Sequence, residues 1–234
     1  MIPFWLHALS STSLLLALAC AAIIAGDVLR HPQHMWIMNV VWPIAALFAG
    51  IFVVIAYFRY GRLGAHDAVN GAPKKPFAVS VGEGATHCGA GCTLGDICAE
   101  ILAYAYPAVA IWFGWQTLFS EKMFAVWILD FVLAFAFGIV FQYFAIAPMR
   151  GLSFWPGLKA ALKADTLSLT AWQIGMYGFM AIAQLYFFRS LLGANLEPAS
   201  VEFWFMMQIA MIAGFFTSYP VNWWLIRAGI KETM

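Results

Sequence analysis

The stretch MFAVWILDFVLAFAFGIVFQYFAIA, from Met123 to Ala147, decides the fold class of this chain. Its only charged residue is Asp130, and the rest is almost entirely apolar. A helix needs about 20 apolar residues to cross the roughly 30 Å hydrocarbon core of a bilayer, so the stretch is long enough to span a membrane. Only helices and closed barrels satisfy their backbone groups in lipid, and this run is too long and continuous for a barrel strand. The sequence therefore predicts a transmembrane helix here.

The composition extends this prediction to the whole chain. Of its 234 residues, 64% are hydrophobic and 10% are charged, which is typical of integral membrane proteins. We predict an all-α integral membrane protein, with a single membrane domain over residues 1–234 built as a bundle of six transmembrane helices. The expected spans are Thr12 to Val28, Met35 to Phe58, Leu94 to Leu118, Met123 to Ala147, Leu167 to Phe188 and Glu202 to Ile226.

The distribution of Lys and Arg predicts the orientation of this bundle. With six spans, most of these residues flank one side, and only Arg30, Lys122 and Arg189 flank the other. Because Lys and Arg are enriched on the cytoplasmic side of membranes, both termini and a loop over residues 59–93 are expected in the cytoplasm. The expected location is the inner (plasma) membrane, crossed several times. A net charge of +1 argues against nucleic acid as a partner and leaves the lipid bilayer as the expected environment.

A cluster of potential ligands lies between the second and third expected spans. The stretch from Thr86 to Asp96 reads THCGAGCTLGD and contains His87, Cys88 and Cys92. One helical turn beyond Asp96 comes Glu100. Imidazole, thiol and carboxylate groups are thus concentrated at the expected membrane boundary.

The glycines of this region allow two local structures. Five glycines between residues 82 and 95 favour a turn-rich loop, and Thr93 with Asp96 has the pattern of a capping box that would open the third helix. If the helix begins earlier, Cys88, Cys92, Asp96 and Glu100 share one face at four-residue spacing.

The donor types favour a soft metal ion. Thiolate and imidazole suit Cu(I), and Zn(II) less, while the spacing H-C-x3-C lacks the second ligand pair of a zinc finger. The sequence predicts a soft-metal (copper-like) binding membrane protein, acting as a metal transporter or homeostasis factor. Its expected metal ligands are His87, Cys88, Cys92, Asp96 and Glu100.

Other readings of the same residues stay open. In a thiol-based membrane oxidoreductase, Cys88 and Cys92 would cycle between dithiol and disulfide, although the reducing cytoplasm counts against this. In a non-catalytic membrane scaffold, the cysteines would be small apolar fillers. A homo-oligomer is a further option.

Polar and thioether side chains within the spans suggest a transport path. Asp130 lies about two turns into the fourth span, where an ionisable group is costly and therefore a functional candidate. Methionines at helical spacing follow on the fifth and sixth spans, although ordinary packing also explains such a pattern. The residues assigned to the path are Asp130, Met176, Met180, Met207, Met211 and Asn222.

Three long motifs resemble one family. They are THCGAGCTLGD, the stretch HPQHMWIMNVVWP from His31 to Pro43, and FWFMMQIAMIAGFFTSYPVNWWLIRAGIKETM from Phe203 to Met234. Together they resemble an uncharacterised family of bacterial integral membrane proteins, domain of unknown function 4396. The resemblance implies a multi-helix membrane domain and no established reaction, so the functional prediction rests on residue chemistry.

Overall fold

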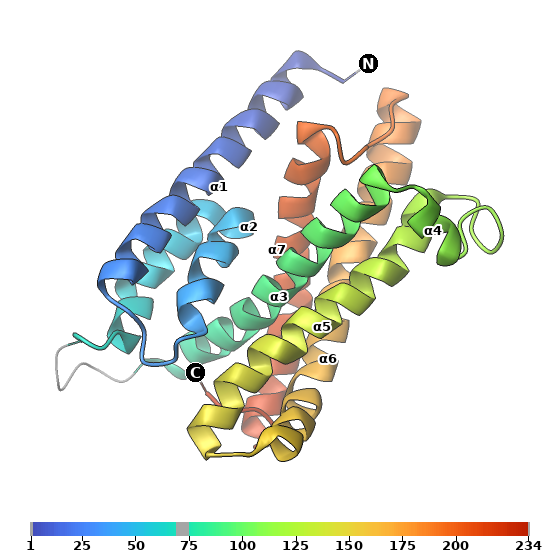
Figure 1. Ribbon diagram of the computed structural model, residues 1–234. Helices are drawn as coiled ribbons and strands as arrows, with labels where there is room; N and C mark the ends of the chain where they lie inside the picture. Colours follow the sequence, from blue (N-terminus) through green and yellow to red (C-terminus); the bar gives the residue numbers. More distant parts are fainter. Residues whose placement is uncertain (1, 69–74, 234) are drawn as a thin grey trace.

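The computed structural model describes residues 2–68 and 75–233, and within them every regular element is a helix (Figure 1). The all-α prediction is thereby confirmed. Lys74 and the rest of 69–74, part of the predicted loop 59–93, lie outside the described residues. The elements are α1 (Phe4–Arg30), α2 (Met38–Arg59), η1 (Gly61–Gly64), α3 (Phe77–Ala105), α4 (Ala108–Trp112), α5 (Lys122–Arg150), α6 (Phe154–Ala181), the π-helical η2 (Ile182–Leu192) and α7 (Val201–Arg227).

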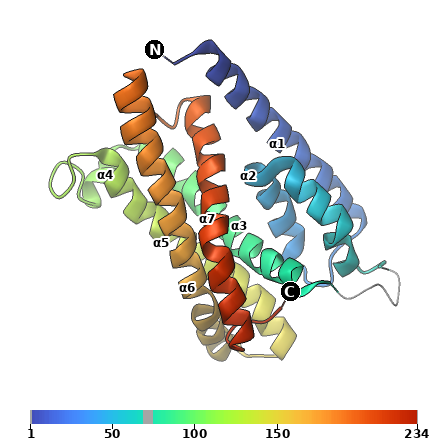
Figure 2. The ribbon, with the colours of Figure 1, turned by 180° about the vertical axis from the view of Figure 1, so that it is seen from behind.

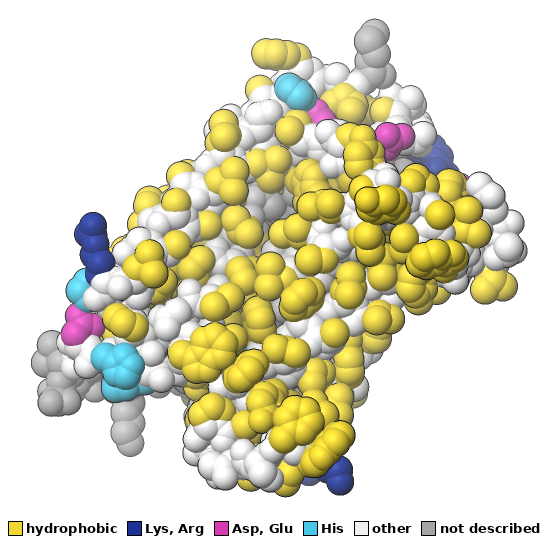
Figure 3. Space-filling model, viewed as in Figure 1, with side chains coloured by type: hydrophobic (Ala, Val, Ile, Leu, Met, Phe, Trp, Pro, Cys, Tyr) yellow, Lys and Arg dark blue, Asp and Glu magenta, His cyan; other side chains and the backbone are white. Residues whose placement is uncertain are grey.

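Four of the described helices, α1, α2, α5 and α7, are long and apolar enough to cross a membrane. Large apolar side chains lie on the outside of the bundle, such as Phe52, Leu15 and Phe216. Figure 3 shows apolar side chains spread over one face, with the charged ones gathered at its margins. Such an apolar exterior is what a helical bundle needs in lipid, so the structure supports a membrane protein.

Helix α2 does not run straight through the bundle. Its backbone reverses at Gly50, where φ is 50° and ψ is −125°, a conformation that only glycine adopts easily. As a result Trp42 and Tyr57 lie edge to face with ring centroids 5.5 Å apart. Arg62, beyond the end of α2, also pairs with Asp27 near the end of α1 at 2.8 Å. Figure 2 shows the two halves of α2 folded back on each other.

The chain therefore enters and leaves this region at the same end of the bundle. The span predicted from Met35 to Phe58 is not confirmed as a single crossing, because residues Met38–Arg59 fold back at Gly50 into a hairpin, which we call the re-entrant hairpin. The tip of the hairpin is held in the bundle by Gln208, whose Nε2 donates to the carbonyl oxygen of Leu47 at 2.7 Å. This contact satisfies one of the backbone groups that the reversal frees.

The first and last long helices run in parallel. His7 contacts Glu202 at 2.7 Å and Ser13 donates to Gln208 at 2.8 Å, so the start of α1 lies beside the start of α7. We call this the upper end, as drawn in Figure 1, and the opposite end the lower end. The described ends of the chain therefore lie at opposite ends of the bundle. The prediction of six spans with both termini in the cytoplasm is not confirmed, because the chain reverses within α2.

The predicted His/Cys loop is also corrected. Residues 77–93 belong to α3, and this helix begins and ends earlier in the chain than the predicted span from Leu94 to Leu118. The glycines there permit close packing instead of turns. A β-carbon on Gly95 would lie 2.3 Å from the backbone nitrogen of Ala134 on α5, and one on Gly91 would lie 2.7 Å from the α-carbon of Gly138. The remaining predicted spans lie within α1, α5, the α6–η2 pair and α7.

Candidate functional site

Helix α3 carries a row of four polar side chains through the bundle. Cys88, Cys92, Asp96 and Glu100 follow at four-residue spacing, and all are buried, with Glu100 the most exposed at 6%. They cover about 18 Å along the helix axis. The alternative in which the helix begins early is thus confirmed. We call these four residues the α3 row.

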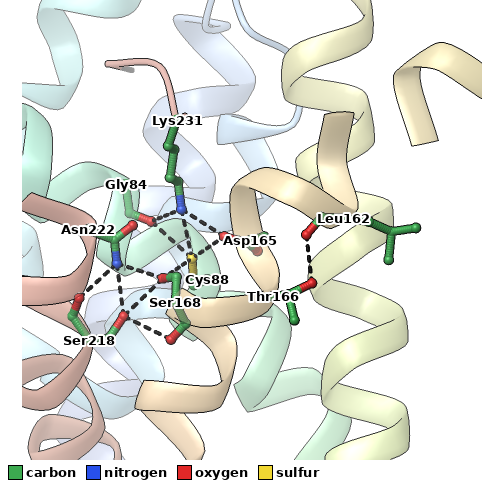
Figure 4. Close-up of polar contacts among 9 residues, drawn as sticks. All are labelled: Gly84, Cys88, Leu162, Asp165, Thr166, Ser168, Ser218, Asn222 and Lys231. Atoms are coloured by element: carbon green, nitrogen blue, oxygen red, sulfur yellow. Dashed lines mark hydrogen bonds and ion pairs between the residues drawn. The ribbon is translucent and has the colours of Figure 1, made fainter. Parts of the chain in front are cut away.

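The lower part of the row joins a buried polar cluster, shown in Figure 4. The Cys88 thiol lies 2.7 Å from Asp165 Oδ1 and 3.0 Å from Ser168 Oγ. Lys231 Nζ donates to the same Asp165 oxygen at 2.7 Å and to Cys88 Sγ at 3.0 Å. We call this group the lower cluster; its members are Gly84, Cys88, Asp165, Ser168, Asn222 and Lys231.

The charge of Lys231 is maintained by its partner. Lys231 and Asp165 both have fully buried side chains. Burial alone acts to lower the pKa of the Lys231 ammonium, but the Asp165 carboxylate and the Cys88 sulfur together outweigh burial and raise this pKa above its ordinary value. In the sequence Lys231 counts only among the basic residues that indicate topology, and Asp165 was not predicted, because nothing in the sequence links two residues so far apart.

His87 lies beside Cys88 in sequence but makes no hydrogen bond to the lower cluster, although it is close enough to Asp165 and Lys231 to interact with them electrostatically. Its ring is fully buried, sits edge to face with Phe141 at 6.1 Å, and has no hydrogen-bond partner among the described residues. Within residues 2–68 and 75–233, no three His, Cys, Asp or Glu side chains form a group that could hold a metal ion. The predicted metal ligands therefore lie one after another along α3. In this described part of the chain Cys88 and Cys92 are free thiols.

The upper part of the row meets a third carboxyl group. Close contact of Gly95 with Ala134, in antiparallel helices, brings Asp130 beside the turn of α3 that holds Glu100. Asp96, Glu100 and Asp130 interact electrostatically with one another. The carboxyl oxygens of Asp130 are buried without a hydrogen-bond partner in the described structure, and the buried Asp96 carboxyl has only the Gln173 side chain beside it. We call these three residues the acid group.

Two cavities reach the acid group. The upper cavity, of about 370 Å³, is lined by Glu100 together with Lys122 and Met180. The side cavity, of about 250 Å³, is lined by Asp96 together with Met207 and Met211. Three of the four methionines assigned to a transport path thus border cavities that the acid group reaches. Met176 is fully buried on α6, and Asn222 lies in the lower cluster.

The family model for the domain of unknown function DUF4396 matches residues 79–231. The chain belongs to the DUF4396 family. The DUF4396 match begins in α3 and ends at Lys231, so it contains both the acid group and the lower cluster. Helix α1 and the re-entrant hairpin lie outside it, including the stretch from His31 to Pro43 that contributed to the resemblance. No curated protein and no solved structure matches the chain.

Proposed function

We propose that the protein conducts protons through a membrane, with the acid group as its relay. The observation that carries this proposal is the complete burial of Asp130, whose two carboxyl oxygens lack hydrogen-bond partners in the described part of the chain, next to the buried Asp96, which has only Gln173 beside it. Buried polar groups are almost always paired, and ionisable groups within a bilayer usually line substrate or proton pathways.

Electrostatics explains why protons are the expected cargo. The ammonium of Lys122 acts on Glu100 alone among the three carboxyl groups. Three carboxylates that interact in a low-dielectric interior cannot all be ionised beside a single cation, so at least one of them holds a proton. The described residues do not group around a metal position. Proton transfer needs no common coordination centre, because a proton can be handed from one carboxyl group to the next.

The cavities supply entry routes for this relay. Glu100 borders the upper cavity and Asp96 the side cavity, so a proton entering from either cavity meets one carboxyl group of the acid group first. Asp130 lies on α5 one helical turn from Ala134, where α5 closely contacts Gly95 of α3, and it interacts electrostatically with both Asp96 and Glu100. We therefore assign the central transfer step to Asp130.

The proposed orientation places the lower end in the cytoplasm. Of the described Lys and Arg residues, Lys122 and Arg189 lie at the upper end and all others at or near the lower end. Arg30, assigned to the opposite side by six spans, joins the majority because α1 ends at the lower end. With the positive residues inside, the N-terminus lies outside and the membrane is the inner (plasma) membrane.

Soft-metal transport stays a second proposal, supported by Met207 and Met211. Their thioethers border the side cavity together with Asp96, and thioethers are ligands that Cu(I) accepts. Cys88 is less suited to this role than the sequence suggested, because the Lys231 ammonium lies 3.0 Å from its sulfur and repels another cation. The oxidoreductase and scaffold alternatives remain predictions.

Proton flux into proteoliposomes tests the main proposal. Purified protein is reconstituted with an internal pH-sensitive dye, and a potassium diffusion potential drives flux. We expect acidification well above that of protein-free liposomes, a loss of about tenfold or more in Asp130→Asn, and unchanged flux in Asp67→Asn, whose exposed carboxyl lies outside the acid group. Full flux in a folded Asp130→Asn variant, or no flux in the wild type, would contradict the proposal.

The same liposomes test the second proposal. Cu(I) uptake that is lost in a Met207→Leu, Met211→Leu variant with proton flux intact would support soft-metal transport. Uptake that is absent, or unaffected by these substitutions, would reject it.

A further inference from the structure

The Lys231 ammonium occupies the lower cluster as a metal cation occupies a coordination site. Its Nζ lies 2.7 Å from Asp165 Oδ1, 3.4 Å from the Gly84 carbonyl oxygen and 3.0 Å from Cys88 Sγ. Figure 4 shows these three ligand atoms, from α3 and α6, converging on the nitrogen. Lysine is rarely buried this completely, so its enclosure requires the paired carboxylate.

The cluster holds more acceptors than this ammonium uses. Asp165 Oδ2 and Asn222 Oδ1 are buried and have no partner in the described residues. Asn222 donates its amide nitrogen to Ser168 Oγ at 2.6 Å and to Ser218 Oγ at 2.9 Å, which fixes where its oxygen points. A β-carbon on Gly84 would lie 3.8 Å from both Asn222 Oδ1 and Lys231 Cε, so that oxygen faces the space beside the lysine.

Lys231 reaches this position from outside the bundle. After α7 the backbone turns at Gly229, where φ is 67°, and the amide of Lys231 donates to the Leu225 carbonyl oxygen at 3.2 Å. The next residue, Glu232, pairs with Arg150 at 2.7 Å on the surface. The Lys231 side chain is therefore a tethered cation inserted from a surface segment.

We propose that the lower cluster is a second cation-binding site, separate from the acid group, which holds one small monovalent cation and is occupied by the tethered Lys231 ammonium. One carboxylate surrounded by neutral oxygen and thiol ligands balances a single positive charge, and these oxygen donors suit an alkali or ammonium ion. The proposal does not depend on proton conduction.

Removing the Lys231 ammonium from the lower cluster tests this proposal. In Lys231→Met the apolar chain is retained and Asp165 is left without its cation. Thermal unfolding in detergent is measured in choline chloride, and in sodium, potassium or methylammonium chloride at equal ionic strength. We expect at least one of the three cations to raise the Tm of Lys231→Met saturably, by about 3–5 °C at ten times its Kd. The wild type and the exposed-lysine control Lys159→Met should show no such cation-specific rise.

A double variant separates site binding from a general salt effect. Lys231→Met, Asp165→Asn removes both buried charges, so it should fold without an added cation and show no specific response. A response of Lys231→Met no larger than that of the wild type or the double variant would overturn the proposal. Failure of Lys231→Met to fold in every salt, when the double variant folds, would also overturn it, whereas folding only with a small cation would support it. Proton flux is not part of this readout, so its absence would leave the result unaffected.

Discussion

Single glycines on α3 determine how closely this helix approaches α5. A methyl group on Gly95 would collide with the backbone of Ala134, which cannot move without displacing α5. Gly178 on α6 has open space around its α-carbon. We therefore predict that Gly95→Ala destabilises the protein by about 1–3 kcal/mol, while Gly178→Ala is neutral or stabilising by up to about 1 kcal/mol. Denaturant unfolding of the two variants checks this, and equal stabilities would show that the close contact is not needed.

Residue spacing predicted part of the candidate site. The four-residue spacing of Cys88, Cys92, Asp96 and Glu100 was visible in the sequence, as was the unusual position of Asp130. Partners on other helices were not, because Asp165 and Lys231 meet only through the packing of α6 against the segment after α7. The expected convergence of His87 with the thiols failed because neighbouring helical residues point about 100° apart.

Among the elements, α2 differs most from its prediction. Its sequence is as apolar as a true span, and the only local sign of reversal is Gly50. A glycine in an apolar helix does not by itself predict a turn, because the glycines of α3 instead allow close packing against α5. Hydropathy thus located the long apolar helices but did not distinguish a hairpin from a crossing.

Cysteine labelling tests the hairpin directly. The rings of His34 and His66 lie on opposite sides of α2 in sequence, yet their centroids are 4.2 Å apart. In a background without native cysteines, we predict that His34→Cys and His66→Cys both react with a membrane-impermeant maleimide from the same side of the membrane. Labelling from opposite sides would mean that α2 crosses the bilayer.

For the whole molecule, the parallel arrangement of α1 and α7 fixes the relation between the termini. The contacts of His7 with Glu202 and of Ser13 with Gln208 place residue 2 and residue 233 at opposite ends. We predict that a reporter fused to the N-terminus is active only outside the cytoplasm, and one fused to the C-terminus only inside. Reporters active on the same side would contradict this topology. The sequence does not predict that the termini lie at opposite ends, because this depends on whether α2 folds as a hairpin or as a single crossing.

If the acid group takes up and releases protons within the membrane, infrared difference spectroscopy across a pH step should detect the change in its carboxyl groups. Protonated carboxylic acids have a carbonyl stretch that is separate from the amide bands, so each buried acid can be followed by its own signal. We predict such a band in the wild type, changing in intensity with pH and reduced or shifted in Asp130→Asn. A spectrum with no protonated-carboxyl band at any pH, or one identical in the Asp130→Asn variant, would contradict the account.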